Sequence, residues 1–206
     1  MGTAIFDKFP ISGDFGGKKV LNLGCGFAKY PAKNVTNLDA YAVCQPDVVC
    51  NLEKGRLPFE DESFDLIIAN HVLEHVKNWW AVFEECARIV RPGGAIIIYV
   101  PGPGNDSTVG YRDHVSQINH YSFYGTMDTM PGTNAWAEAN KKSKVGQLFM
   151  EQAERRYYRA LWMRFLPKKL LFWAGQHLRN MISEEGYVFR KIAKREKPRG
   201  NDRQAL

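Results

Sequence analysis

Three side chains that can accept a proton or bind a cation lie close together in the sequence HVLEH. These are His71, Glu74 and His75, and their spacing of three and four residues places them on neighbouring faces of one helical turn. Two more histidines, His114 and His120, follow in a segment rich in Gly, Pro and Tyr. Imidazole and carboxylate groups act as general bases and also bind divalent metals. A base, a metal ligand and a packing role therefore all stay open for these residues.

A second group of residues suits a nucleotide-like ligand. The sequence VLNLGCG is an apolar run that ends in a turn with Gly24 and Gly26, where the backbone can approach a ligand without side-chain collision. Asp39 ends the next apolar run, where a carboxylate can accept hydrogen bonds from ribose hydroxyls. Asn51 and Leu52 follow the third run, where an amide and an aliphatic chain can hold an adenine.

The elements that must position these residues alternate along the chain. Short apolar runs bounded by Gly, Pro or Asp predict five buried strands, at residues 20–23, 35–39, 47–50, 64–69 and 95–100. Apolar residues at helical spacing predict a helix over 78–90, with Asn78 as its N-cap and the sequence RPGG at its end. This order of strands and connections predicts a parallel α/β sheet.

The second half of the chain has a different pattern. Residues 102–147 show no long periodic element and leave the carboxyl end of the fifth strand, so we expect them to cover the substrate. Residues 148–158 alternate in part like a strand, which we favour, although their Glu and Gln content also suits a helix. A helix from Pro167 to about residue 182 and a last strand over 187–192 follow. The polar residues 195–206 predict a disordered tail.

The bulk composition indicates one domain. The chain has 206 residues, 45% of them hydrophobic, and no apolar run approaches the roughly 20 residues of a membrane span. Four cysteines lack CxxC spacing, so we expect reduced thiols. The first residues lack the pattern of a signal peptide, and we therefore expect a cytoplasmic protein.

The charge is unevenly distributed. From Lys141 onward, 17 Lys and Arg residues stand against 6 Asp and Glu, whereas the remaining residues have 11 against 16, so the two parts carry about +11 and −5. Such a basic part favours an anionic partner, and a solvated basic face is an equal alternative. The predicted helix from Pro167 has apolar residues on more than one face, so a homodimer or membrane-surface contact also stays open.

The ordered set VLNLGCG, VTNLDA, DVVCNLEKGRLPFEDESFDLIIANHVLEHV and RIVRPGGAIIIYVP, within residues 18–101, resembles the class I S-adenosylmethionine-dependent methyltransferases of the small-molecule, type 11-like kind. The resemblance implies a Rossmann-like, seven-stranded, mostly parallel sheet whose last strand is antiparallel. It also implies S-adenosylmethionine as the cofactor. By position it assigns contacts with this donor to Asn22, Gly24, Gly26, Asp39, Asn51, Leu52, Asn70 and His71.

Two positions depart from related patterns. Asn22 stands where the family commonly has an acid, and it keeps a hydrogen-bonding oxygen without the charge, so we expect lower donor affinity. The spacing HxxEH also resembles the ExxEH of small-RNA 3′-end methyltransferases and ubiquinone-pathway O-methyltransferases, where a metal assists hydroxyl binding. His71 replaces the first Glu of that pattern. We assign the catalytic role to His75 and His114 and predict no metal.

The resemblance implies one methyltransferase domain over residues 1–206, with a donor-binding core at 18–101, a substrate cover at 102–147, and C-terminal strands with a basic helix at 148–194. The expected reaction is methyl transfer to a hydroxyl, carboxyl or amine of a small molecule or saccharide. Two alternatives are an RNA-directed enzyme that uses the basic part and methylates a ribose or an end, and a non-catalytic partner protein that binds S-adenosylmethionine.

Overall fold

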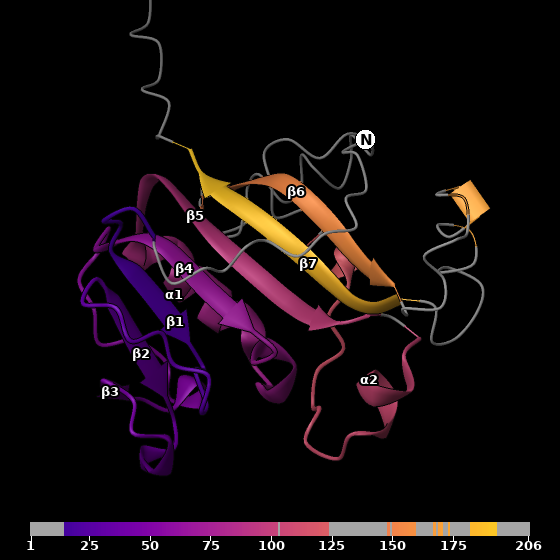
Figure 1. Cartoon of the computed structure of the whole chain (residues 1–206), viewed down its shortest axis with the longest axis horizontal. Coiled ribbons are helices and arrows are strands. Elements are labelled where there is room, and N and C mark those ends of the chain that lie inside the picture. The colour runs from indigo at the N-terminus through magenta and orange to yellow at the C-terminus, as the bar shows by residue number, and fades with distance from the viewer. Residues whose placement is uncertain are drawn as a thin grey trace, which may run out of the picture.

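The computed structural model describes residues 15–102, 104–123, 148, 150–159, 167, 169–170, 173 and 182–192. In this part of the chain seven strands form one sheet, in the order β3-β2-β1-β4-β5-β7-β6 (Figure 1). The strands are β1 (Val20–Leu23), β2 (Val35–Asp39), β3 (Val48–Val49), β4 (Phe64–Asn70), β5 (Val90–Pro101), β6 (Met150–Arg159) and β7 (Ile182–Lys191). Strands β1 to β5 are parallel, and β7 is antiparallel to both of its neighbours. The predicted mostly parallel sheet with an antiparallel last strand is confirmed.

Strand β1 lies in the middle of the parallel part because every one of its residues is apolar or can be satisfied internally. All four are buried, without the alternation of a strand that faces water on one side. Its last residue, Leu23, pairs with Leu38 of β2 and with Ala69 of β4. The segments that leave these three strands therefore start at the same edge of the sheet.

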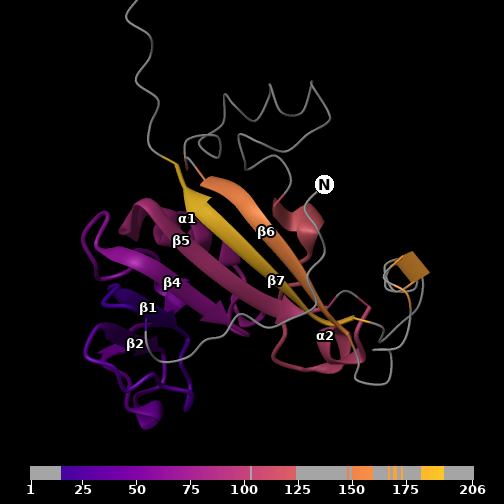
Figure 2. The same ribbon diagram turned by 45° about the horizontal axis from the view of Figure 1, so that its top comes forward.

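Helix α1 (Trp79–Ile89) packs on one face of this sheet (Figures 1 and 2). Its apolar stripe is buried at Val82, Phe83, Cys86, Ala87 and Ile89. Asn78 precedes the helix as predicted, but its side chain makes no capping hydrogen bond, and its backbone carbonyl accepts the N–H of Ala81 instead. Strand β5 begins directly at Val90, so RPGG lies within this strand and is not a separate turn.

The first part of the predicted substrate cover is anchored in the hydrophobic core. It contains α2 (Asp106–Gly110) and the 3-10 helix η4 (His120–Phe123), and Figure 1 shows α2 beyond the carboxyl end of β5. Phe123 is fully buried, and its ring centroid lies 5.4 Å from that of Trp79, 5.6 Å from that of Phe83 and 4.8 Å from that of Phe189. This aromatic cluster fixes the chain that runs from β5 to η4.

Several predictions fall largely on residues that the structure does not describe. Of the predicted helix from Pro167, only Lys169, Leu170 and Trp173 are described as helical, and Leu170 and Trp173 are exposed. The cover beyond residue 123 and the tail at 195–206 lie outside the described residues. None of the helices described is both long and apolar enough to span a membrane. The four cysteines form no disulfide.

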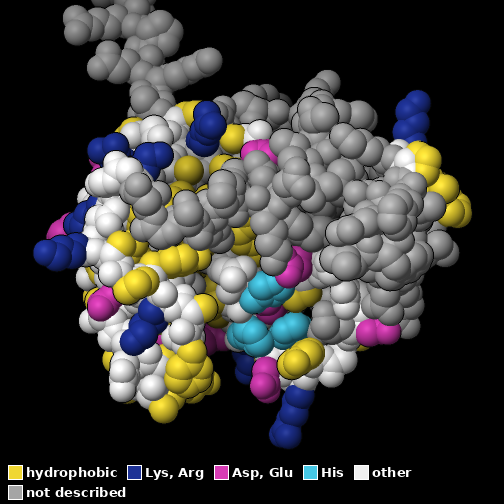
Figure 3. Space-filling model, in the orientation of Figure 1, with side chains coloured by type: hydrophobic (Ala, Val, Ile, Leu, Met, Phe, Trp, Pro, Cys, Tyr) yellow, Lys and Arg dark blue, Asp and Glu magenta, His cyan; other side chains and the backbone are white. Residues whose placement is uncertain are grey.

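The carboxyl ends of the parallel strands carry a distinctive set of side chains. In the orientation of Figure 1, histidine side chains gather in one place on the surface, with acidic side chains beside them (Figure 3). Ligands of open α/β sheets bind at this edge, since the loops that follow the strands meet there. The functional site is therefore expected at this edge.

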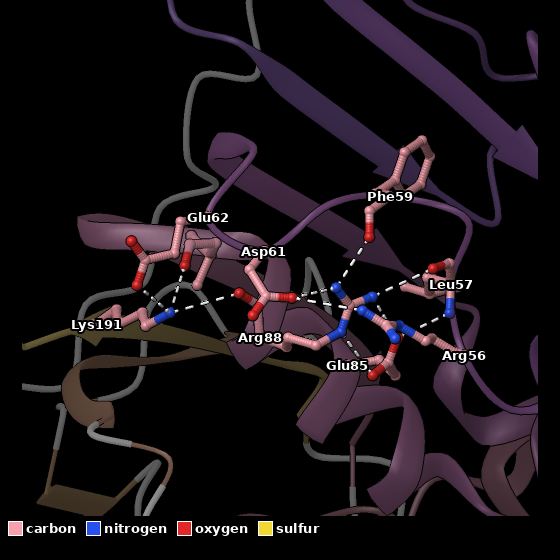
Figure 4. A network of polar contacts seen from close by, with 9 residues as sticks. Arg56, Leu57, Phe59, Asp61, Glu62, Glu85, Arg88 and Lys191 are labelled. Atoms are coloured by element: carbon pink, nitrogen blue, oxygen red, sulfur yellow. Dashed lines mark hydrogen bonds and ion pairs between the residues drawn. The ribbon is translucent and has the colours of Figure 1, made fainter.

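On another side of the sheet, Arg88 of α1 holds the loop before β4 in place (Figure 4). Its guanidinium donates to the carbonyl oxygens of Phe59 at 2.9 Å and Leu57 at 3.2 Å. It also forms ion pairs with Glu85 at 2.7 Å and Asp61 at 2.8 Å. Burial raises the pKa of Glu85, but the hydrogen bonds from Arg88 and from the Leu57 N–H outweigh it, so this pKa lies below its ordinary value.

Candidate active site

The turn after β1 requires glycine at two positions for different reasons. Gly24 has φ 63° and Gly26 has φ 49°, both in the left-handed region that favours glycine. A Cβ atom on Gly24 would also lie 2.2 Å from Cγ2 of Val72, the second residue after β4. A Cβ atom on Gly26 would meet no atom within 4 Å. The turn is therefore packed at Gly24 and open at Gly26.

Asp39, at the end of β2, holds this turn. Its Oδ2 accepts the backbone N–H of Gly26 at 2.8 Å, and its Oδ1 accepts that of Tyr41 at 2.9 Å. The residue is 8% exposed. A carboxylate offers about four lone-pair sites, so two remain for the hydroxyl groups of a ligand. Asp39 can thus fix the two loops and bind a ribose at the same time.

Asn22 lies beneath the turn. It is 3% exposed, and its amide donates to the carbonyl oxygen of Ala28 at 3.1 Å and to Oδ1 of Asn37 at 3.0 Å. Asn37 in turn donates its backbone N–H and its side-chain amide to Asp47, at 2.7 and 3.0 Å. In this network Asn22 acts as a support for the loop, and its predicted contact with the donor stays a prediction.

The two residues predicted to hold an adenine lie in different environments. Asn51 is exposed, and its Oδ1 caps the 3-10 helix η2 (Leu52–Lys54) by accepting the N–H of Glu53 at 2.9 Å. Leu52 is 8% exposed and belongs to the main hydrophobic cluster. Most of its surface is therefore used in the core, whereas Asn51 is accessible.

Two aromatic residues at this edge were not identified from the sequence. Phe27 directly follows Gly26 and is 79% exposed, and Tyr41 follows Asp39 by two residues and is 70% exposed. Large aromatic groups that stay in water beside a polar turn offer faces on which a planar ligand can stack. Their position next to the glycine turn and the acid was the signal available in the sequence.

His71 begins the other half of the site. It follows Asn70, the exposed last residue of β4, and has φ 52°, while the 3-10 helix η3 (Leu73–His75) starts two residues later. The expectation that His71, Glu74 and His75 share one helical turn is therefore wrong for His71. The left-handed backbone turns the chain at this point, and the His71 N–H donates to the carbonyl oxygen of Tyr99 at 3.0 Å.

The imidazole of His71 lies between two carboxylates. Its Nε2 is 3.4 Å from Oε1 of Glu184, and its Nδ1 is 3.1 Å from Oε1 of Glu74. The hydrogen bonds to Glu184 and Glu74 raise the pKa of His71 to about 9, against the opposing effect of burial. His71 is therefore a cation at neutral pH, and it cannot act as a base there.

Glu184 was also missed by sequence reasoning. It lies on β7 and pairs with Pro101 at the end of β5, and this register brings it to the carboxyl edge. It is separated from His71 by more than a hundred residues, and no local pattern marks it. Only the pairing of β7 with β5 shows that this carboxylate reaches the site.

The structure brings together His75 and His114, the two residues predicted to be catalytic. Their ring centroids are 4.8 Å apart, and Tyr111 stacks on His114 at 5.2 Å. Nδ1 of His75 is 3.0 Å from the carbonyl oxygen of Asp113. A carbonyl oxygen only accepts, so Nδ1 is the donor, and in the neutral imidazole Nε2 is then the acceptor. The side chain of His120 lies outside the described residues.

The backbone of the cover fixes this arrangement. The N–H groups of Val115 and Ser116 donate to the carbonyl oxygen of Glu74, at 2.9 and 3.0 Å, and the Ser116 hydroxyl donates to that of Val76 at 2.8 Å. One carboxylate oxygen of Glu74 and one nitrogen each of His75 and His114 lie within 4.8 Å of one another. The three groups can thus act on one proton or hold one cation.

Comparison with known proteins agrees with this geometry. Residues 21–98 match the family model described as a methyltransferase domain. A sterol 4-C-methyltransferase of Caenorhabditis elegans is 26% identical over 119 residues, which cover 57% of this chain and 36% of the relative. A ubiquinone biosynthesis O-methyltransferase of Maricaulis maris is 34% identical over 119 residues, which cover 47% of this chain and 46% of the relative. The match thus spans less than half the length of these two relatives.

The fold is also similar to that of a solved methyltransferase. The crystal structure of an S-adenosylmethionine-dependent methyltransferase from Archaeoglobus fulgidus superposes with a TM-score of 0.56 at 11% identity, and covers 85% of this chain and 87% of that one. At this identity the likeness concerns the fold alone. The matched domain over residues 21–98, the glycine turn and the strand order together support a class I S-adenosylmethionine-dependent methyltransferase. The cofactor of this family is S-adenosylmethionine.

Proposed function

We propose that the chain binds S-adenosylmethionine at the carboxyl ends of β1 and β2 and transfers its methyl group to a hydroxyl, carboxyl or amine of a small molecule or saccharide. The observation that carries this proposal is the 2.8 Å hydrogen bond from the Gly26 N–H to Asp39. This bond links the glycine turn to the acid that we propose binds the ribose. The turn follows β1, and between β1 and β4 the order of the strands in the sheet reverses its direction.

Each part of the donor has a matching group. The two free lone-pair sites of Asp39 suit the ribose hydroxyls, and the open backbone at Gly26 suits the methionine moiety. The exposed amide of Asn51 can read an adenine edge, while Phe27 and Tyr41 offer stacking faces. His71 and Asn70 lie at the end of β4, on the side where the methyl group leaves the donor.

The acceptor is activated by removal of its proton. His75 has the lone pair of Nε2 available, so it can take the proton of a hydroxyl as that oxygen attacks the methyl carbon. The carbon–sulfur bond breaks, its electrons remain on sulfur, and S-adenosylhomocysteine leaves. The sulfonium is already a good electrophile, so the protein contributes mainly orientation and the exclusion of water. His114, next to His75, is the second candidate for contact with the acceptor.

The relatives support a small-molecule acceptor without fixing its reacting atom. By their names, one methylates a sterol at carbon and the other acts at oxygen in ubiquinone biosynthesis. The RNA-directed alternative depends on the basic part of the chain from Lys141 onward. Retention of labelled RNA that disappears with salt, together with methyl transfer to it, would favour that alternative over a small molecule.

Calorimetric titration with S-adenosylhomocysteine tests the donor site. We expect binding by the wild-type chain and at least about tenfold weaker binding by Asp39→Asn, because an amide offers fewer acceptor sites to the ribose. Glu60→Gln is the matched control, since Glu60 is an exposed carboxylate in the loop before β4. No binding by the wild type would refute the proposal. Binding without transfer of radiolabelled methyl to any acceptor would favour a non-catalytic protein.

A further inference from the structure

The cluster formed by Glu74, His75 and His114 has the composition of a metal site. Two imidazoles and one carboxylate offer ligand atoms within 4.8 Å of one another. Ligand atoms around a bound zinc ion lie roughly 3.0–3.5 Å apart, as bonds of about 2.0–2.2 Å require. Small side-chain movements of about 1 Å would therefore close the cluster around an ion. Three protein ligands would leave a coordination position open, as in catalytic metal sites.

Glu74 provides an independent indication that a cation belongs here. Its side chain is only 2% exposed, and Oε1 is held by Nδ1 of His71 at 3.1 Å. Oε2 is buried and has no hydrogen-bond partner among the described residues. A buried carboxylate oxygen without a partner is costly, and native structures normally satisfy it. An ion beside His75 and His114 would satisfy this oxygen.

The histidines are oriented for the same purpose. Nδ1 of His75 is bound to the carbonyl oxygen of Asp113, which leaves Nε2 as the free donor of an electron pair. Metal-binding histidines commonly have their second nitrogen fixed by a carbonyl or carboxylate in this way. Nδ1 of His114 is buried and also lacks a partner in the described part of the chain. The hydrogen bonds from Val115 and Ser116 to Glu74 hold the two loops that carry these ligands together.

We propose that Glu74, His75 and His114 bind one divalent transition-metal ion of the zinc type, with the open coordination position directed to the acceptor. Imidazole nitrogens with a single carboxylate favour zinc or its neighbours over magnesium and calcium, which prefer oxygen ligands alone. His71 is a positioning residue in this site: it fixes the Glu74 carboxylate from the side away from the ion.

The ion also narrows the acceptor class, a consequence that rests on the proposed function. A bound divalent cation lowers the pKa of a hydroxyl group that coordinates it. Val72 lies against Gly24 of the donor turn and stands between His71 and Glu74 in the sequence, so the two sites are adjacent. A hydroxyl-bearing acceptor is therefore favoured over an amine. With the ion bound, Nε2 of His75 is a ligand and the acceptor proton passes to solvent, whereas the base role proposed above for His75 applies to the metal-free site.

Zinc binding to the full chain tests the site without any assay of activity. The protein is stripped with EDTA and titrated with Zn²⁺ in competition with a chromophoric chelator, and metal content is measured after dialysis. We expect one equivalent of zinc, and at least about tenfold weaker binding by His75→Asn and Glu74→Gln. Asp113→Asn is the matched control, because Asp113 contributes only its backbone carbonyl and its side chain is exposed. Cys50→Ser controls for binding to the partly exposed thiol.

The outcomes separate the two proposals. Less than one equivalent of zinc, or unchanged affinity in His75→Asn, overturns the metal site. If Glu74→Gln does not fold, as circular dichroism would show, His75→Asn decides the question because His75 is exposed. Zinc binding without S-adenosylhomocysteine binding removes the donor proposal and leaves the metal site. Donor binding by a protein that takes up no zinc overturns the metal site and leaves the donor proposal.

Discussion

Replacement of the two turn glycines by alanine distinguishes packing from ligand contact. Alanine at φ 49° in Gly26→Ala costs roughly 1–2 kcal/mol of conformational strain. Alanine also lowers the conformational entropy of the unfolded chain, which stabilises the folded state by about 0.4–1 kcal/mol. Because nothing lies within 4 Å of the new methyl group, no steric cost is added. We therefore expect Gly26→Ala to lower the free energy of unfolding by about 1 kcal/mol.

Gly24→Ala adds a collision to the same strain. Its Cβ would lie 2.2 Å from Cγ2 and 2.6 Å from Cβ of Val72, whereas ordinary contacts are 3.4–4 Å. Rotation of the Val72 side chain cannot move its own Cβ, so the backbone must shift. Overpacking of this kind costs typically 1–3 kcal/mol. The free energy of unfolding should therefore fall by about 2–4 kcal/mol, and Gly24→Ala with Val72→Gly should recover the steric part.

Gly24→Ala should be the less stable of the two variants. Gly26→Ala should instead weaken donor binding directly while the protein stays folded. Urea unfolding followed by circular dichroism gives the free energies, and calorimetry gives the affinity for S-adenosylhomocysteine. Gly26→Ala should stay folded and yet bind this ligand at least tenfold more weakly, about 1.4 kcal/mol, because its methyl group occupies the open space above the turn. Unchanged affinity in folded Gly26→Ala would refute our placement of the donor. Equal stability of the two variants would refute the packing argument.

Further predictions concern the Arg88 network and an exposed aromatic. Arg88→Met should lower the free energy of unfolding by about 2–3 kcal/mol in urea, because it removes charge-assisted hydrogen bonds at a side chain that is 19% exposed. Arg91→Met, whose side chain is 60% exposed, should cost less than about 1 kcal/mol. Since Arg88 keeps the pKa of Glu85 below 4.5, this stabilisation is present above that pH and lost as the pH falls, and acid titrations of Arg88→Met should show a flatter decline. Phe27→Ala should weaken S-adenosylhomocysteine binding about tenfold by loss of stacking, measured by calorimetry, while Val109→Ala, also at an exposed position, should not.

The proximity of the residues predicted to bind the donor could largely be inferred from the sequence, because they follow neighbouring strands. Gly24 and Gly26 follow one strand, Asp39 ends the next, and parallel strands bring their carboxyl ends to the same edge. The sequence could not show that Asn22 is used beneath the loop, because an amide that supports a turn and one that binds a ligand have the same pattern. The sequence also could not show that Leu52 is used in the hydrophobic core, because an apolar residue after a strand can face the core or a ligand.

The arrangement of the proposed acceptor site could be inferred only in part, because it depends on contacts between distant segments. His75 and His114 were both predicted from the sequence as catalytic candidates, but their proximity depends on the hydrogen bonds of Val115 and Ser116 to Glu74. The contact of His71 with Glu184 requires the register of β7 against β5. Helical spacing also predicted the wrong arrangement for His71, since a left-handed residue between strand and 3-10 helix leaves no regular period.

The proposed donor and acceptor sites meet at one short segment of the chain. The segment from Asn70 to His75 touches the glycine turn through Val72 and also carries Glu74 and His75. The donor turn is tied locally to β2 by Asp39, so changes in the cover leave it intact. His114 and Glu184, in contrast, come from segments that only long-range contacts bring to the site. We therefore expect substitutions in those segments to alter the proposed acceptor and metal sites while the glycine turn keeps its geometry.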